Sequence, residues 1–297
     1  MEPSELVIEA TGLRKSFDDK PVLNGVDLKI PRGAIVGLIG ANGAGKSTLL
    51  KCLLGLLKIT EGSARVYGDD PWDLSVETKA KLGYVPQVVK FYPWMNVQQM
   101  VDYTAAHYEN WDHQASDLML KNFDLKHTDK VKVLSTGQQQ RLGLVLAMGY
   151  HPELLILDEP AASLDPAGRR TLLRSLLEHS QNAQQTALFS THITSDLERV
   201  ASHVAILRNG VIDFFGVLED LKDSVKRLRI SSDSDLPEDF SVPSTLRSEI
   251  HGSTAVVSVA AADAELISRI QQDWNVQVTV ENLNLEDIFL ELHDEQD

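Results

Sequence analysis

The amino-acid sequence predicts an α/β fold with a smaller α+β module after residue 222. Short apolar runs at residues 34–39, 154–157 and 186–190 have the length and composition of buried strands. Segments with helical spacing of apolar residues separate these runs, and that alternation is typical of an α/β fold. From residue 223 the chain is markedly more acidic. The predicted boundaries are therefore 1–222 for the main domain and 223–297 for the C-terminal module.

The main domain is expected to contain further strands and a helical region. Strand patterns at residues 6–10 and 22–30, on either side of a turn, and at residues 62–68 predict further strands near the start of the chain. Residues 88–150 have apolar positions at helical spacing and are expected to form an α-helical subdomain. A further helix is expected over residues 166–179, where a proline suits the first helical position.

Turn-forming residues separate the predicted strands and helices in the second half of the sequence. Asn209-Gly210 lies between two strand patterns and predicts a hairpin with a primed turn. The polar run Ser231–Asp235 predicts a boundary or a loop. The small α+β module is then expected to contain strands at 255–259 and 276–280 and helices at 264–274 and 285–292.

Composition excludes several classes of protein. No apolar run approaches the roughly twenty residues that span a bilayer. The single cysteine, Cys52, excludes an internal disulfide framework and fits a reducing cytosol. The net charge is −15, and residues 223–297 hold 16 acidic residues against 5 Lys or Arg. Because such a module repels phosphates, we expect no nucleic-acid partner.

The segment from Gly40 to Thr48 fits the phosphate-binding pattern G-x-x-x-x-G-K-[ST], between a predicted strand and a predicted helix. Its glycines let backbone N–H groups turn toward phosphates, and the helix N-terminus adds a positive dipole end. Lys46 can reach the β- and γ-phosphates, and the Ser47 hydroxyl can bind Mg²⁺. The loop residues expected to contact nucleotide are Gly40, Asn42, Gly43, Ala44, Gly45, Lys46, Ser47 and Thr48.

Two acidic residues end the apolar run at 154–157. Asp158 can hold Mg²⁺ through its water shell. Glu159 projects differently because it is one residue further on, so it can face the γ-phosphate and position or deprotonate the attacking water. Two buried acids without a cation would be costly, which makes a purely structural role a weak explanation.

Four more motifs accompany the phosphate loop and the acidic pair in a fixed order. They are Gly83-Tyr-Val-Pro-Gln87, Leu134-Ser-Thr-Gly-Gln138, Ser163-Leu-Asp165 and Ser190-Thr-His192. Together the six motifs, spread over residues 5–222, resemble the ATP-binding cassette (ABC) family. The resemblance implies a P-loop NTPase core with an antiparallel β subdomain and an α-helical signature subdomain.

The resemblance also implies roles for individual residues. His192 is implied to contact the γ-phosphate and the catalytic carboxylate, and Gln87 to touch Mg²⁺ or water and to move with the helical subdomain. Asp165 is implied to lie at the nucleotide site. The signature donors Ser135, Gly137 and Gln138 are implied to contact the ATP of a second subunit. Thr136 stands where the family usually has glycine, and its side chain is expected to fit if it points to solvent.

Three assignments keep alternatives. Phe17 occupies the place of the family's adenine-stacking aromatic, and the alternative is a core phenylalanine. The segment Phe91–Val97, expected to be helical, is the predicted docking surface for a membrane partner, and the alternative is an aromatic core. Residues 285–292 resemble the end of drug-resistance and antibiotic-export cassettes, and the alternative is a helix that caps a small core.

We therefore expect an ATP-hydrolysing subunit of an ABC transporter of the exporter type that uses ATP and Mg²⁺. One phosphate loop and one signature imply a dimer with a second nucleotide-binding subunit, either a copy or a close paralogue. Separate integral-membrane permease subunits are expected to hold this cytoplasmic subunit at the inner face of the cell membrane. The alternatives are a non-transport ABC ATPase and a regulatory module that binds ATP without hydrolysing it.

Overall fold

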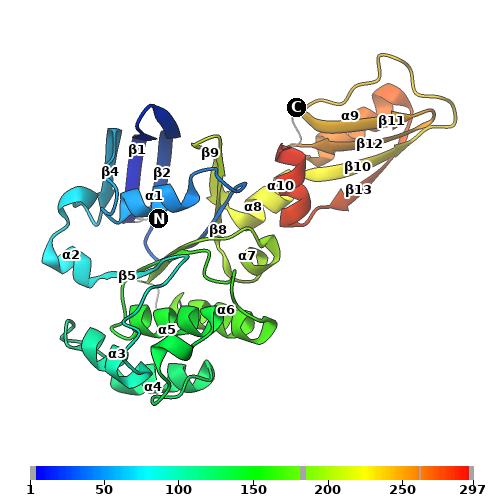
Figure 1. Cartoon of the computed structure of the whole chain (residues 1–297). Helices are drawn as coiled ribbons and strands as arrows, with labels where there is room; N and C mark the ends of the chain where they lie inside the picture. Colours follow the sequence, from blue (N-terminus) through cyan, green and yellow to red (C-terminus); the bar gives the residue numbers. More distant parts are fainter. Residues whose placement is uncertain (1–4, 181–184, 261, 294–297) are drawn as a thin grey trace. The chain divides into compact units, whose positions relative to one another are not determined.

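The computed structural model describes residues 5–180, 185–260 and 262–293 (Figure 1). The chain divides into two compact units, residues 1–215 and 216–297. This division lies a few residues before the predicted boundary. Of the polar run Ser231–Asp235, Ser231 ends a strand, and residues 232–235 form a loop inside the second unit.

A six-stranded sheet forms the centre of the first unit. Its order is β5, β6, β7, β3, β8 and β9, and the pairs from β5 to β8 are parallel. Every residue of β3, β6 and β7 is buried, as the three apolar runs predict. The strands are β5 (Leu82–Val85), β6 (Leu154–Asp158), β7 (Thr186–Ser190), β3 (Ile35–Ile39), β8 (His203–Arg208) and β9 (Val211–Val217).

The hairpin of β8 and β9 forms as predicted. Asn209 and Gly210 have φ angles of +49° and +78°. Both values are positive, as a type I′ turn requires, and Asn and Gly are the residues that tolerate them.

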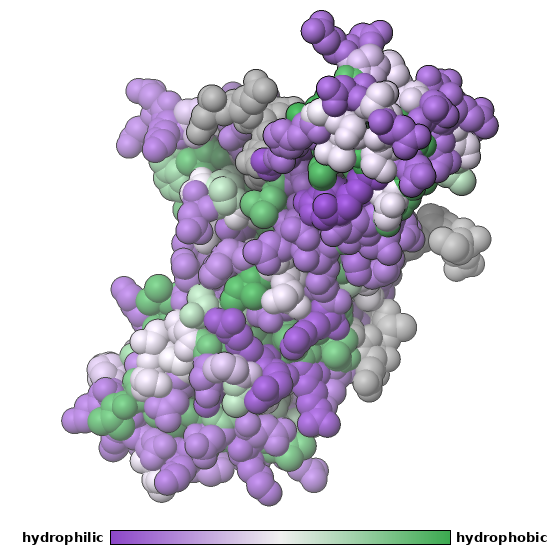
Figure 2. Space-filling model, turned by 90° about the vertical axis from the view of Figure 1, so that its right-hand side faces the viewer, coloured by the Kyte–Doolittle hydropathy of each residue, from purple (hydrophilic) through white to green (hydrophobic). Residues whose placement is uncertain are grey.

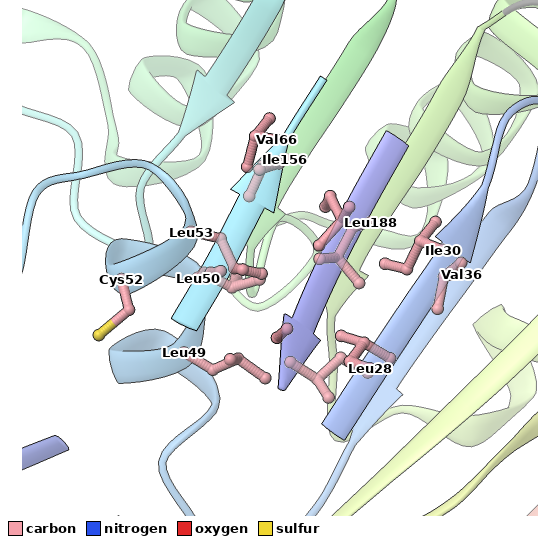
Figure 3. Packing of buried hydrophobic residues seen from close by; sticks show 14 of the residues in the cluster. Leu28, Ile30, Val36, Leu49, Leu50, Cys52, Leu53, Val66, Ile156 and Leu188 are labelled. Atoms are coloured by element: carbon pink, nitrogen blue, oxygen red, sulfur yellow. The ribbon is translucent and has the colours of Figure 1, made fainter. Parts of the chain in front are cut away.

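An antiparallel sheet of three strands accompanies the central sheet in the order β2, β1, β4. Helix α1 packs between the two sheets: its Leu50 and Leu53 share one apolar cluster with Leu28, Val66 and Ile156 (Figure 3). This packing holds the N-terminus of α1 beside the ends of the central strands. The elements are β1 (Leu6–Phe17), β2 (Lys20–Pro31), β4 (Glu61–Val66) and α1 (Lys46–Leu53).

Helices α3 (Val97–Ala105), α4 (His113–Asn122) and α5 (Thr136–Met148) form the predicted helical region, with a 3₁₀ turn at Val131–Val133. Figure 1 shows them gathered on the side of the central sheet away from β1, β2 and β4. The prediction that Phe91–Val97 is helical is wrong. Residues 91–92 have no regular structure, residues 93–94 form a turn, and Asn96 forms an isolated β-bridge with Lys130. The helix begins only at Val97, where Asn96 caps α3 in a capping box with Gln99.

The remaining helices of the first unit are α2 (Val76–Ala80), α6 (Pro166–Ser180) and α7 (Thr194–Val200), with a 3₁₀ turn at Pro71–Asp73. No helix in the described ranges is long and apolar enough to cross a membrane. The face shown in Figure 2 is mainly hydrophilic, with apolar side chains in small separate patches.

The second unit has a four-stranded antiparallel sheet in the order β11, β12, β10, β13. Its apolar core includes Leu228, Val257 and Ile270. Leu285 and Ile288 of the last helix are fully buried, which agrees with the capping alternative for that helix. The elements are α8 (Leu218–Ser224), β10 (Lys226–Ser231), β11 (Thr245–His251), β12 (Thr254–Val259), α9 (Ala264–Trp274), β13 (Gln277–Asn282) and α10 (Leu285–His293).

Candidate functional site

The phosphate loop joins β3 to α1 and depends on its glycines. A Cβ at Gly40 would lie 2.3 Å from the carbonyl oxygen of Leu207, so a larger residue would displace backbone there. Gly43 and Gly45 have φ angles of +85° and +106°, in a region that side chains rarely adopt. The glycines thus allow the loop backbone to wrap around the N-terminus of α1.

Lys46 folds back over this loop. Its side chain is only 7% exposed, and its ammonium donates a hydrogen bond to the Gly40 carbonyl oxygen at 2.7 Å. The ammonium also lies 3.7 Å from the Glu159 Oε1 atom. These oxygens compensate a buried charge that would otherwise be costly. They also hold the ammonium at the mouth of the loop.

Asp158 links the end of β6 to the phosphate loop. The residue is 1% exposed, and its Oδ1 atom accepts hydrogen bonds from the hydroxyls of Ser47 and Ser190, each at 2.9 Å. Carboxylate and hydroxyl oxygens are ligands that Mg²⁺ accepts in proteins. In the described ranges no group of three or more His, Cys, Asp or Glu side chains could hold a metal. A cation beside Asp158 would therefore need further oxygens, such as those of a phosphate.

Glu159 adopts a backbone conformation that is uncommon for its type, with φ of +48°. The residue is 7% exposed, and its Oε2 atom lies 2.8 Å from His192 Nδ1. The His192 side chain is 55% exposed. The structure thus brings together Lys46, Glu159 and His192, from three separate motifs, into what we call the Glu159 cluster. The cluster places one carboxylate between an ammonium at the phosphate loop and an imidazole open to solvent.

Gln87 lies at the same edge of the sheet. Val85 pairs with Leu157 in the parallel β5–β6 ladder, so Gln87 and Glu159 each follow the paired residues by two positions. Because parallel strands end at one edge, both residues reach the site of the acidic pair. Gln87 itself is exposed on the loop after β5.

The signature residues build the start of α5. The Ser135 hydroxyl accepts from the Gln138 N–H at 3.2 Å, and the Gln138 side chain accepts from the Ser135 N–H at 2.9 Å. A Cβ at Gly137 would lie 2.6 Å from the Ser163 carbonyl oxygen, which explains the glycine there. Thr136 is exposed, so its side chain is accommodated as expected. The signature is therefore a rigid helix N-terminus whose first turn offers N–H groups.

Asp165 packs beside the signature helix. Its Oδ1 atom accepts from the Gly168 N–H at 3.0 Å and forms an ion pair with Arg141 of α5. The Gly168 hydrogen bond and the Arg141 charge lower the pKa of Asp165 below its ordinary value. The sequence alone did not single out Arg141.

Phe17 ends β1 and is 45% exposed, so the core alternative for it is wrong. The ammonium of Lys15 lies 4.9 Å from the ring centroid. The ring therefore offers an aromatic surface on a strand rather than filling the interior.

Trp94 is 66% exposed, so the alternative that places it in an aromatic core is also wrong. Its ring lies 5.0 Å from that of Tyr92, which meets Tyr103 edge-on at 5.5 Å. We call Tyr92, Trp94 and Tyr103 the aromatic ridge.

A cavity of about 330 Å³ runs between the Gln87 loop, α3 and α5, and we call it the helical groove. Its lining includes Pro86, Val89, Phe91, Tyr108, Leu146 and Tyr150.

Ser190 supplies a polar contact at the site, although the motif Ser190-Thr-His192 implied no role for it. It is fully buried and pairs with Asp158 in the β6–β7 ladder. The signal that could have found it is a serine at the end of an apolar run. In a parallel sheet, two such strand ends lie side by side.

Comparison with known proteins places this geometry in a family. Residues 23–162 match the ABC transporter family. The bacitracin transport ATP-binding protein BcrA of Bacillus licheniformis is 32% identical over 69% of this chain and 67% of its own length. The Nod factor export ATP-binding protein I of Bradyrhizobium diazoefficiens is 28% identical over 98% of each chain, so the similarity extends through the C-terminal unit.

Among solved structures, an ATP-binding cassette dimer in a post-hydrolysis state with ADP and Pi covers 71% of this chain with a TM-score of 0.63 and 24% identity. That similarity establishes the fold. The sequence similarities establish the family: the chain belongs to the ABC transporter ATP-binding proteins. It is the ATP-binding subunit of such a transporter.

Proposed function

We propose that this subunit drives export through separate permease chains, as one of two ATPase subunits that enclose ATP between them. The Glu159 cluster is the observation that carries the proposal for hydrolysis, because it joins a phosphate-loop lysine to a carboxylate and an imidazole. The name of one relative, for Nod factor export, supports the direction of transport.

Glu159 is the residue that we assign to the attacking water. Its carboxylate is buried and acceptor-only when ionised, so it can orient the water and take its proton. His192, which contacts the same carboxylate and is half exposed, can hold Glu159 in position and donate toward the γ-phosphate. Lys46 supplies positive charge to the β- and γ-phosphates, where charge develops in the transition state.

Mg²⁺ fits the oxygens at the end of β6. Ser47 and Asp158 present a hydroxyl and a carboxylate within 2.9 Å of each other, and Gln87 lies on the loop that follows the neighbouring strand β5. One or two protein oxygens together with phosphates and water are the usual surroundings of this ion. When bound, the ion would neutralise charge on the β- and γ-phosphates.

A second subunit would complete the nucleotide site. Ser135, Gly137 and Gln138 lie at the N-terminus of α5, where the N–H groups of the first turn can bind an anion. We assign these donors to the ATP of the partner subunit. Phe17, at the end of β1, is assigned to the adenine, because nearly half of its surface is exposed.

The permease is proposed to dock on the aromatic ridge and the helical groove. The groove is lined mainly by aromatic and aliphatic side chains, with Lys90 and Thr104 as its polar members, and exposed aromatic residues are favoured at protein interfaces. A short apolar cytoplasmic segment of the permease would suit this lining. Because the groove includes Pro86, beside Gln87, docking and the nucleotide site would be linked. This contact would hold the subunit at the inner face of the membrane.

Glu159→Gln tests the hydrolytic role. We expect steady-state ATP hydrolysis to fall by at least about 100-fold, since the base is lost, while ATP affinity stays within about twofold. An ATP-dependent dimer should accumulate, which analytical ultracentrifugation would detect. Lys46→Ala is the contrasting variant, in which calorimetry should show weaker ATP binding itself. Hydrolysis at the unaltered rate in Glu159→Gln would overturn the assignment.

A further inference from the structure

The end of β7 carries a hydroxyl that joins both acidic residues of the site. Ser190 Oγ donates to Asp158 Oδ1 and accepts from the backbone N–H of Glu159, both at 2.9 Å. The residue is fully buried. One hydroxyl thus donates to Asp158, the last residue of β6, and accepts from Glu159, the residue that follows it.

The backbone conformation of Glu159 shows why the two hydrogen bonds of the Ser190 hydroxyl are important for the site. Its φ of +48° is uncommon for a residue with a long side chain and must be supported by its surroundings. The supporting contact is the Glu159 N–H bond to Ser190, because that N–H is buried and needs an acceptor. The same conformation directs the carboxylate toward Lys46 and His192.

We propose that Ser190 is a positioning residue for hydrolysis. Its hydroxyl holds the Asp158–Glu159 peptide in the left-handed conformation and so aligns the Glu159 carboxylate with the phosphate loop. Ser190 acts through Glu159 and through the orientation of Asp158, and it need not touch the nucleotide. This inference rests on the proposed hydrolytic role of Glu159.

Removal of the hydroxyl should therefore change catalysis more than binding. In Ser190→Ala the Glu159 N–H loses its acceptor, and the peptide can relax from the strained conformation. A displacement of about 1 Å at a catalytic group can cost about 100-fold in rate. We expect kcat to fall by at least about tenfold. The dissociation constant for ATP should stay within about twofold, because the phosphate loop keeps its own glycine and lysine contacts.

Thr186 offers a matched control on the same strand. It is also fully buried, and its hydroxyl accepts from the Gly33 N–H at 2.9 Å, at the opposite end of β7 from the acidic pair. Thr186→Val removes a buried acceptor of the same kind without touching the site. We expect it to lower the melting temperature while kcat stays within about twofold.

A second pair of variants separates the hydroxyl from packing. Ser190→Thr and Ser190→Val add side chains of nearly equal size, but only threonine keeps the hydroxyl. We expect Ser190→Thr to retain at least about five times the kcat of Ser190→Val. This comparison tests the role of the hydroxyl even if Ser190→Ala fails to fold, because the threonine and valine variants add side chains of nearly the same size.

The measurements are steady-state hydrolysis and ATP calorimetry on the full chain, with Glu159→Gln as the reference background. Ser190→Ala should reduce kcat in the native background and have no further effect on the residual rate in Glu159→Gln. Equal rates for Ser190→Thr and Ser190→Val, or a loss of ATP affinity that parallels the loss of rate, would overturn the positioning role. If Ser190→Ala is fully active while Glu159→Gln is inactive, the positioning role of Ser190 is refuted but the hydrolytic role of Glu159 stands. If Glu159→Gln is fully active, the proposed hydrolytic role of Glu159 is itself refuted.

Discussion

Replacing Phe17 by alanine separates base stacking from structural packing. Truncation of a core phenylalanine costs about 3–5 kcal/mol of stability. Phe17 is 45% exposed, so we expect a loss of no more than about 2 kcal/mol, including its contact with Lys15. Stacking on a nucleobase contributes about 1–3 kcal/mol. The dissociation constant for ATP should therefore rise by about 5- to 150-fold.

Calorimetry with ATP and with GTP, together with thermal melting, measures both effects. Phe17→Tyr keeps the aromatic face and is the matched control, which should bind ATP within about threefold of the native protein. Both nucleotides should lose affinity alike, because stacking does not distinguish base edges. Unchanged ATP affinity in Phe17→Ala with a large drop in melting temperature would refute the stacking role.

Three further predictions concern coupling, thiol chemistry and pH. Trp94→Ala should change the free energy of unfolding by less than about 1 kcal/mol, because the side chain is 66% exposed. The same variant should reduce co-purification with the permease, and retained co-purification would contradict docking. Burial raises the pKa of the Cys52 thiol to about 11, so iodoacetamide at pH 8 should label it only in denaturant, and fast labelling of the native protein would contradict this. The pKa of Asp165 is lowered by Gly168 and Arg141. Its stabilising contribution is therefore present above the ordinary aspartate pKa of about 4 and is lost as the pH falls through the lower folded-state pKa. The melting-temperature difference between native protein and Asp165→Asn should shrink as the pH falls through that range, and a constant difference would count against the ion pair.

Much of the fold could be predicted because its signals are local. The apolar runs of β3, β6 and β7 were confirmed because strands buried on both faces must be apolar throughout. Asn209-Gly210 indicated the β8–β9 hairpin because the turn needs positive φ angles, which asparagine and glycine tolerate. Strand β11 escaped prediction because six of its seven residues are exposed, so it shows no alternation of buried and exposed positions.

The segment before α3 shows why an aromatic pattern is ambiguous. Trp94 and Tyr92 could equally have packed inward or faced solvent, since both are large and apolar. Both are exposed in the segment that precedes the Asn96 cap, and the helix starts only at Val97. Helical spacing by itself did not reveal this boundary.

The sequence by itself determined the phosphate loop, the acidic pair and their order along the chain. Each depends on neighbouring residues and on conformations that only certain residue types adopt. The tertiary structure alone decided how the motifs meet. Ser190 contacts Asp158 and the Glu159 N–H, and Lys46 approaches Glu159, through the pairing of β6 with β7 and the packing of α1. Those contacts join residues more than thirty positions apart, and no local pattern specifies which strand ends become neighbours.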